Sequence, residues 1–171
     1  MASLLENLIE TLTKENDEYV ELLALSREKT GKIVSADLEG LQDIVGREQV
    51  IVERIGELEK KREECAADIS NVLNIPVSEL KIDKLVMMLE KQPADQRQLM
   101  EVHDRLKKTL SDMVKVNDNN KALLQESLEM IEFELNLARS AKMAPGTANY
   151  GKGAVGVDDI PGGAGTFDAK Q

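Results

Sequence analysis

The sequence predicts an all-α protein: an elongated antiparallel three-helix coiled-coil bundle with a short additional helix and a disordered, glycine-rich C-terminal tail. Aromatic residues make up only 2% of the 171 residues, so Leu, Ile, Val and Met must form the core, as they do in packed helices. Charged residues make up 32%, which suits long helices with solvated outer faces. Apolar residues also recur every three or four positions in three long segments, the spacing of a coiled-coil seam.

The first segment reads as an amphipathic helix. Its apolar residues fall at spacings of three, four or multiples of seven: Leu5, Leu8, Leu12, Tyr19 and Leu22. A turn is expected within residues 30–37. There Gly31 suits the C-terminal cap of the first helix, and Ser35 or Asp37 suits the N-cap of the second.

The second helix has the most regular pattern, a strict three-four alternation. Its seam consists of Leu41, Ile44, Glu48, Ile51, Ile55, Leu58, Arg62, Cys65, Ile69 and Val72. We expect the two charged members to be partly exposed at the edge of the seam. Three glycines, Gly40, Gly46 and Gly56, each weaken the helix by about 1 kcal/mol relative to Ala. The sequence leaves open whether they permit close packing.

Pro76 ends this pattern, because proline cannot continue a helix interior. A short helix is expected over residues 83–90, and Pro93 suits the first position of a long helix that ends near Ala141. The seam expected on that helix consists of Leu99, Val102, Leu106, Leu110, Met113, Asn117, Asn120, Leu124, Leu128, Ile131, Leu135 and Ala138. The predicted domains are a bundle over residues 1–141 and a flexible tail over residues 142–171. That tail holds seven of the eleven glycines.

Two asparagines, Asn117 and Asn120, interrupt the apolar seam of the long helix. A buried amide on a seam fixes the register of neighbouring helices, because it must find hydrogen-bond partners. The functional alternative is that these amides hydrogen-bond the backbone of a bound segment.

The C-terminal half of the long helix carries a second apolar stripe, formed by Leu123, Met130, Phe133 and Leu137. It lies roughly 120° around the helix from the seam through Leu124 and Leu128. One stripe is expected to face the core. The other needs a partner: the first helix, a second copy, or another protein laid into the groove. Alternatively, the bundle buries both stripes.

Several classes of function are disfavoured. The net charge of −10 argues against nucleic acid and against an anionic membrane surface. No apolar run approaches the roughly 20 residues of a membrane span, and the N-terminus lacks the basic region of a signal peptide. Cys65 stands alone, which indicates a reduced cytosol, and reads as a small buried hydrophobe. His103 reads as a surface residue. No motif indicates catalysis, a cofactor or a metal, so we expect no enzyme.

The order of these segments resembles the FlgN-type flagellar export chaperones. The resemblance covers "NDEYVELLALSREKTGKIVSADLEGL", "IVGREQVIVERIGELEKKRE", "NDNNKALLQESLEMI" and a tail with "NYGKG" and "FDAKQ". It implies a cytosolic chaperone for flagellar type III secretion. Such a protein binds the hook–filament junction (hook-associated) proteins, its cargo, keeps them unassembled and delivers them to the flagellar export apparatus.

The resemblance also points to the C-terminal region for cargo binding. Together with the stripes it gives these candidate residues: Asn117, Asn120, Leu123, Leu124, Met130, Phe133, Leu137, Tyr150 and Phe167. A further hypothesis is that the tail folds back over the second stripe through its Tyr150, Ile160 and Phe167 until cargo arrives.

Two other functions stay open. One is a structural coiled-coil scaffold or self-assembling helical subunit, and the other is an exported filament component. Stoichiometry separates the first from a chaperone. A scaffold oligomerises through the second stripe, whereas a chaperone buries it against one cargo molecule. A homo-oligomer in the absence of cargo is compatible with either.

Overall fold

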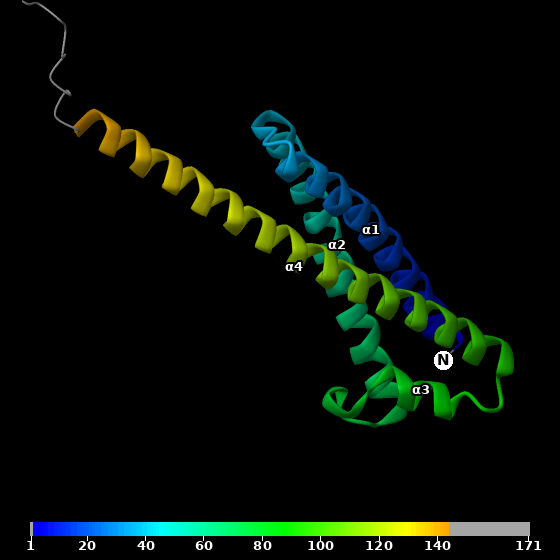
Figure 1. The fold of residues 1–171 in the computed structure, drawn as a ribbon. Helices are drawn as coiled ribbons and strands as arrows, with labels where there is room; N and C mark the ends of the chain where they lie inside the picture. The colour runs from blue at the N-terminus through cyan, green and yellow to red at the C-terminus, as the bar shows by residue number, and fades with distance from the viewer. Residues whose placement is uncertain (1, 144–171) are drawn as a thin grey trace, which may run out of the picture. The chain divides into compact units, whose positions relative to one another are not determined.

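The computed structural model describes residues 2–143, which form four α-helices and one short 3₁₀ helix (Figure 1). The elements are α1 (Ala2–Val34), α2 (Leu38–Leu73), η1 (Val77–Glu79), α3 (Ile82–Met88) and α4 (Pro93–Met143). The predicted all-α bundle is confirmed. A compact unit spans Met1–Glu132, and α4 continues from there as an exposed helix. Tyr150, Ile160 and Phe167 lie outside the described residues, as does the predicted tail from residue 144.

The bundle has an up-down-up arrangement. α1 and α2 form an antiparallel hairpin with closely approaching backbones. α4 packs on α1 through side chains, and three hydrogen bonds between them join residues 90, 93 and 94 positions apart. Because this separation stays nearly constant along both helices, α1 and α4 run in the same direction.

The turn between α1 and α2 ends α1 later than we expected. Gly31 lies within α1 and does not cap it. The Asp37 amide donates to the Lys32 carbonyl at 3.0 Å and the Ala36 amide to the Ile33 carbonyl at 3.1 Å, which is the Schellman pattern. Ala36 is the residue with a left-handed backbone, with φ of 54°. The helix therefore continues past the glycine and closes with a local hydrogen-bond pair around an alanine.

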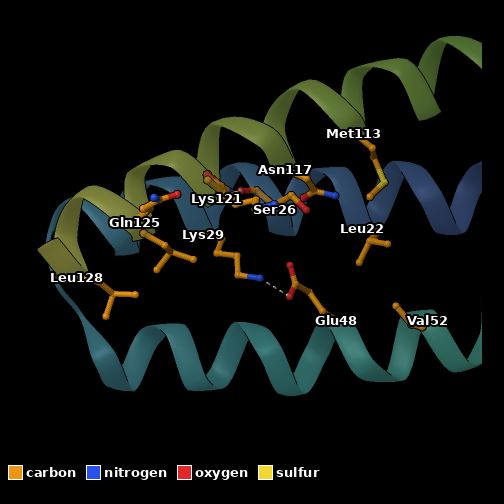
Figure 2. Close-up of a pocket in the computed structure, with 12 residues that line it drawn as sticks. Leu22, Ser26, Lys29, Glu48, Val52, Met113, Asn117, Lys121, Gln125 and Leu128 are labelled. Carbon is orange, nitrogen blue, oxygen red and sulfur yellow. Dashed lines mark hydrogen bonds and ion pairs between the residues drawn. The ribbon is translucent and has the colours of Figure 1, made fainter.

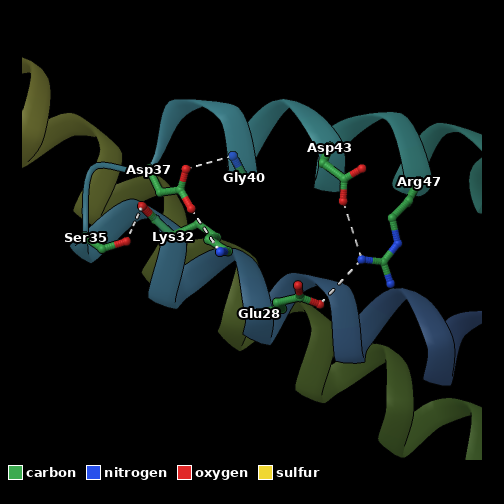
Figure 3. Close-up of polar contacts among 7 residues, drawn as sticks. All are labelled: Glu28, Lys32, Ser35, Asp37, Gly40, Asp43 and Arg47. Atoms are coloured by element: carbon green, nitrogen blue, oxygen red, sulfur yellow. Dashed lines mark hydrogen bonds and ion pairs between the residues drawn. The ribbon is translucent and has the colours of Figure 1, made fainter.

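The N-cap of α2 agrees with the prediction and is Asp37 (Figure 3). Its carboxylate accepts a hydrogen bond from the Gly40 amide at 2.9 Å and pairs with the Lys32 ammonium at 2.9 Å. A Cβ atom at Gly40 would lie 2.5 Å from Asp37 Oδ2 and 2.8 Å from Lys32 Cδ. A methyl group at Gly40 would therefore force the capping carboxylate or the Lys32 side chain to move, whereas no atom outside the local helix lies within 4 Å of such a Cβ at Gly46.

This contrast predicts opposite effects for the same substitution. Gly46→Ala should raise the free energy of unfolding by about 1 kcal/mol, because it adds helix propensity in open space. Gly40→Ala should lower it, because the new methyl group displaces the capping carboxylate, and a lost cap costs about 1 kcal/mol. Urea unfolding followed by circular dichroism measures both. Equal stabilisation by the two variants would contradict the role given to Gly40.

The core consists of two apolar clusters. The first gathers residues from α1, α2, α3 and α4, among them Leu12, Ile69, Leu85 and Leu99. The second lies nearer the α1–α2 turn and contains Leu22, Leu23, Leu25, Ile44, Ile51, Ile55 and Met113. Cys65 is buried in the first cluster, as predicted.

A layer of charged groups lies where the two clusters meet. Glu15 on α1 is buried, with its side chain 5% exposed, and its Oε2 atom lies 3.3 Å from Arg62 Nε on α2. Tyr19 touches both clusters, and its hydroxyl lies 3.4 Å from Glu59 Oε1. Arg62, a predicted interruption of the α2 seam, is partly exposed as expected.

Glu15 makes the stability of the bundle depend on pH. Burial raises the pKa of this carboxyl above its ordinary value of 4.5, against the opposing Arg62 guanidinium and with help from the Glu59 carboxylate. A carboxyl whose pKa is raised by folding favours the folded state while it is protonated. That contribution is lost as the pH rises from the ordinary value through the raised one.

We therefore expect Glu15→Gln to gain stability relative to the wild type between pH 4 and pH 7, because glutamine has no charge to bury. The measurement is the difference in unfolding free energy between the two proteins at each pH. If this difference instead moves in favour of the wild type toward pH 7, the attraction of Arg62 exceeds the cost of burial.

The seam of α4 departs from the predicted one by one residue at several positions, first at residue 110 and again at residues 117, 124 and 128. The prediction placed Leu110 on the seam, but Leu110 is exposed and Thr109 is buried in its place. The Thr109 hydroxyl lies 2.9 Å from Asn16 Oδ1 on α1 and 3.0 Å from the Arg105 carbonyl. The observed inward positions, buried or half-buried, are Leu99, Val102, Leu106, Thr109, Met113, Val116, Asn120, Leu123 and Ser127. These keep a strict three-four alternation.

Candidate protein-binding surface

The register between α1 and α4 determines where the bundle stops covering α4. Asn120 hydrogen-bonds Ser26 and Thr30, so it lies level with about residue 28 of α1. Counting on from there, the end of α1 at Val34 lies level with about residue 126 of α4. The rest of the 51-residue helix has no α1 residue beside it.

The two apolar stripes of this half of α4 are both largely exposed, so the expectation that one of them faces the core is wrong. Leu128 is 65% exposed and Met130 is 61% exposed. In the last part of the helix, Phe133 and Leu137 are 63% and 60% exposed. Only Leu123 is half-buried. The strict alternation of the seam runs on through Leu123, Ser127, Met130, Glu134 and Leu137, so three of the four residues of the second stripe continue the bundle seam.

A groove lies beside Leu124 and Leu128, between α2 and α4, with α1 as its floor (Figure 2). Its volume is about 680 Å³. The lining residues are Leu22, Ser26, Lys29, Glu48, Val52, Met113, Asn117, Asn120, Lys121, Leu124, Gln125 and Leu128. An apolar groove between helices, with a few polar groups along it, is the usual form of a helix-binding site.

The contribution of α1 and α2 to this groove was not predicted. Lys29 Nζ and Glu48 Oε2 form an ion pair at 2.8 Å across the groove, and both side chains are more than three-quarters buried (Figure 2). Glu48 interrupts the α2 seam, and as expected it is only partly exposed. That charged residue at an apolar position was the one signal in the sequence that this part of α2 differs from the rest.

The two asparagines have different positions. Asn120 is buried, its Nδ2 donates to the Ser26 carbonyl at 2.8 Å, and the Thr30 hydroxyl donates to its Oδ1 at 2.5 Å. The predicted structural role, a buried amide that fixes helix register, therefore fits Asn120. Asn117 is exposed and lines the groove, so the expectation of a buried seam residue is wrong for it.

Other groups singled out in the sequence take no part in this surface. His103 is half-buried, and its Nδ1 lies 3.8 Å from the exposed Asp104 carboxylate. Within residues 2–143, no three His, Cys, Asp or Glu side chains come together in a way that could hold a metal ion. None of the described helices is both long enough and apolar enough to span a membrane.

Comparison with known families gives one match. The model of the FlgN protein family matches residues 1–155, which include all the described helices. No curated protein and no solved structure matches the chain significantly. A match over most of the chain, onto a helical bundle with an uncovered apolar helix, is decisive for the family. The chain belongs to the FlgN family of flagellar export chaperones.

Proposed function

We propose that this protein is a cytoplasmic chaperone for hook-associated proteins. It holds these hook–filament junction proteins apart until export and then delivers them to the flagellar export apparatus. The observation that carries the proposal is the continuation of the α4 seam beyond the end of α1. A seam with regular spacing and no partner within the described chain is suited to a helix supplied by another protein.

The cargo surface in this proposal consists of the exposed apolar residues of α4 and the lining of the groove. Met130, Phe133 and Leu137 supply large apolar side chains, and Met130 adds an unbranched, adaptable one. Asn117 and Leu124 line the groove, where an exposed amide is available for a bound backbone. Asn120 is buried and Leu123 is half-buried, so in this proposal they support the cargo surface from inside the bundle. Tyr150 and Phe167 are proposed to add contacts from the tail.

The proposal is tested with the purified protein and a hook–filament junction protein from the same genome. Size-exclusion chromatography with light scattering should show a discrete soluble complex. The triple variant Met130→Ser, Phe133→Ser, Leu137→Ser should weaken cargo binding at least about tenfold, since each change removes an apolar contact worth about 1 kcal/mol or more.

A matched control is the triple variant Val45→Ser, Val50→Ser, Val72→Ser, which removes three exposed apolar side chains from α2. It should bind cargo as the wild type does. Equal loss in both triple variants, or no complex with the wild type, would overturn the proposal. A large self-assembled oligomer that takes up no cargo would favour the structural scaffold.

A further inference from the structure

The face of α4 that carries Leu124, Leu128, Ile131 and Leu135 has a property independent of cargo, which is self-complementarity. These four residues are 39–65% exposed and follow each other at spacings of four, three and four. That is the spacing of a coiled-coil seam. We call them the outer stripe, to distinguish them from the stripe of Met130, Phe133 and Leu137.

We propose that the outer stripe pairs with the same stripe of a second copy, with the two α4 helices antiparallel and a two-fold axis between residues 129 and 130. Leu128 then meets Ile131 of the second copy, and Leu124 meets Leu135. Each contact occurs twice, because the interface is symmetric. The two copies form four apolar layers in this way.

Charges at the edge of the outer stripe favour this register. In an antiparallel pair, the residues that directly follow every second seam position face each other across one edge of the interface. On α4 these are the residues after positions 117, 124, 131 and 138. Asp118 then faces Arg139 of the second copy, and Gln125 faces Glu132. The pair of opposite charges occurs twice. Neither Asp118 nor Arg139 forms an ion pair within residues 2–143.

Displacement by one heptad in either direction is disfavoured by the same charges. One displacement places Asp118 against Glu132 of the second copy. The other places the two Glu132 carboxylates against each other. Like charges at such positions destabilise a helix pair, so they act against the wrong registers. These charges therefore favour the proposed register over both heptad displacements.

The N-terminal end of the outer stripe extends into the groove. Leu124 and Leu128 line it, together with Asn117 and Lys121. In the proposed register the small Ala138 of the second copy meets Lys121, so the end of its α4 enters this part of the groove. The interface is short, and we expect a dissociation constant in the range of about 1–100 μM, typical of weak contacts.

Sedimentation equilibrium of the full chain over a range of concentrations tests the proposal. The wild type should pass from the chain mass of 18.9 kDa toward twice that value. Asp118→Arg and Arg139→Asp should each weaken the dimer about tenfold, because each replaces two attractive contacts with two repulsive ones. The double variant Asp118→Arg, Arg139→Asp should restore it.

Two controls separate this interface from general effects. Asp104→Arg changes the net charge equally at a site 14 residues before Asp118, beyond the proposed apolar layers, and should leave the dimer unchanged. Leu128→Glu should abolish the dimer while circular dichroism shows an unchanged helix content. A wild type that stays monomeric at all concentrations would overturn the proposal. The outer stripe would then be a surface for a different protein and not for a second copy. A dimer that Asp118→Arg does not weaken or the double variant does not restore would also overturn the proposal. Cargo takes no part in these measurements, so their failure is distinct from failure of the proposed function.

Discussion

Leu99→Ala should lower the free energy of unfolding by about 3 kcal/mol, the largest effect that we expect from a single substitution. Leu99 is 0% exposed and belongs to the cluster that joins α1, α2, α3 and α4. Truncation removes buried apolar surface and leaves a cavity that rigid neighbours fill only in part. Urea unfolding followed by circular dichroism measures the loss, with the m-value as a check that the unfolded state is unchanged.

The control for Leu99 is Leu128→Ala, measured at a concentration where the protein is monomeric. Both residues are leucines on α4 and both belong to the predicted seam. Because Leu128 is 65% exposed, its truncation should change the unfolding free energy by no more than about 0.5 kcal/mol. Comparable losses in the two variants would mean that the far part of α4 is packed in solution, contrary to the surface described above.

Asn120→Ala should cost about 2 kcal/mol, the second largest expected effect. The amide makes two hydrogen bonds to α1 in a buried position, and removal leaves the Thr30 hydroxyl without its closest partner. Asn117→Ala, three residues away and exposed, should change stability by no more than about 0.5 kcal/mol. The same urea experiment compares them.

The two asparagine variants also separate stability from binding. If Asn117 acts only in the groove, its variant should fold with normal stability and bind cargo more weakly. A loss of stability from Asn117→Ala as large as that from Asn120→Ala would contradict the assignment of one asparagine to the core and the other to the surface.

Features set by local chemistry could be predicted from the sequence. The start of α4 at Pro93 and the N-cap at Asp37 depend on residues within one helical turn, and both are confirmed. The heptad pattern of α2 identified its core residues Ile44, Ile51 and Ile55, because their spacing of seven and four residues keeps them on one face. The valines next to Ile44 and Ile51 fall off that face and are exposed.

The inward face of α4 could not be predicted, because it depends on a partner far away in the sequence. At residues 109 and 110 a pattern of apolar residues selects Leu110. Thr109 is buried instead, since Asn16 of α1 satisfies its hydroxyl. A choice that differs by one residue moves to a position about 100° around the helix. The same offset recurs at residues 116 and 123, where the apolar pattern selects 117 and 124, whereas Met113 and Asn120 are inward in both seams. The groove was missed for the same reason, as its other walls belong to α1 and α2.

The pairing of α1 with α4 across 90–94 residues also has a consequence for how the protein is made. On the ribosome, α1 and α2 can form their hairpin once Leu73 has left the exit tunnel, and Asn120 emerges only about 2–10 s later at about 5–20 residues per second. During that interval the nascent hairpin presents the apolar side that α4 will cover. During its synthesis the protein is therefore an incompletely covered helical hairpin until its last helix arrives.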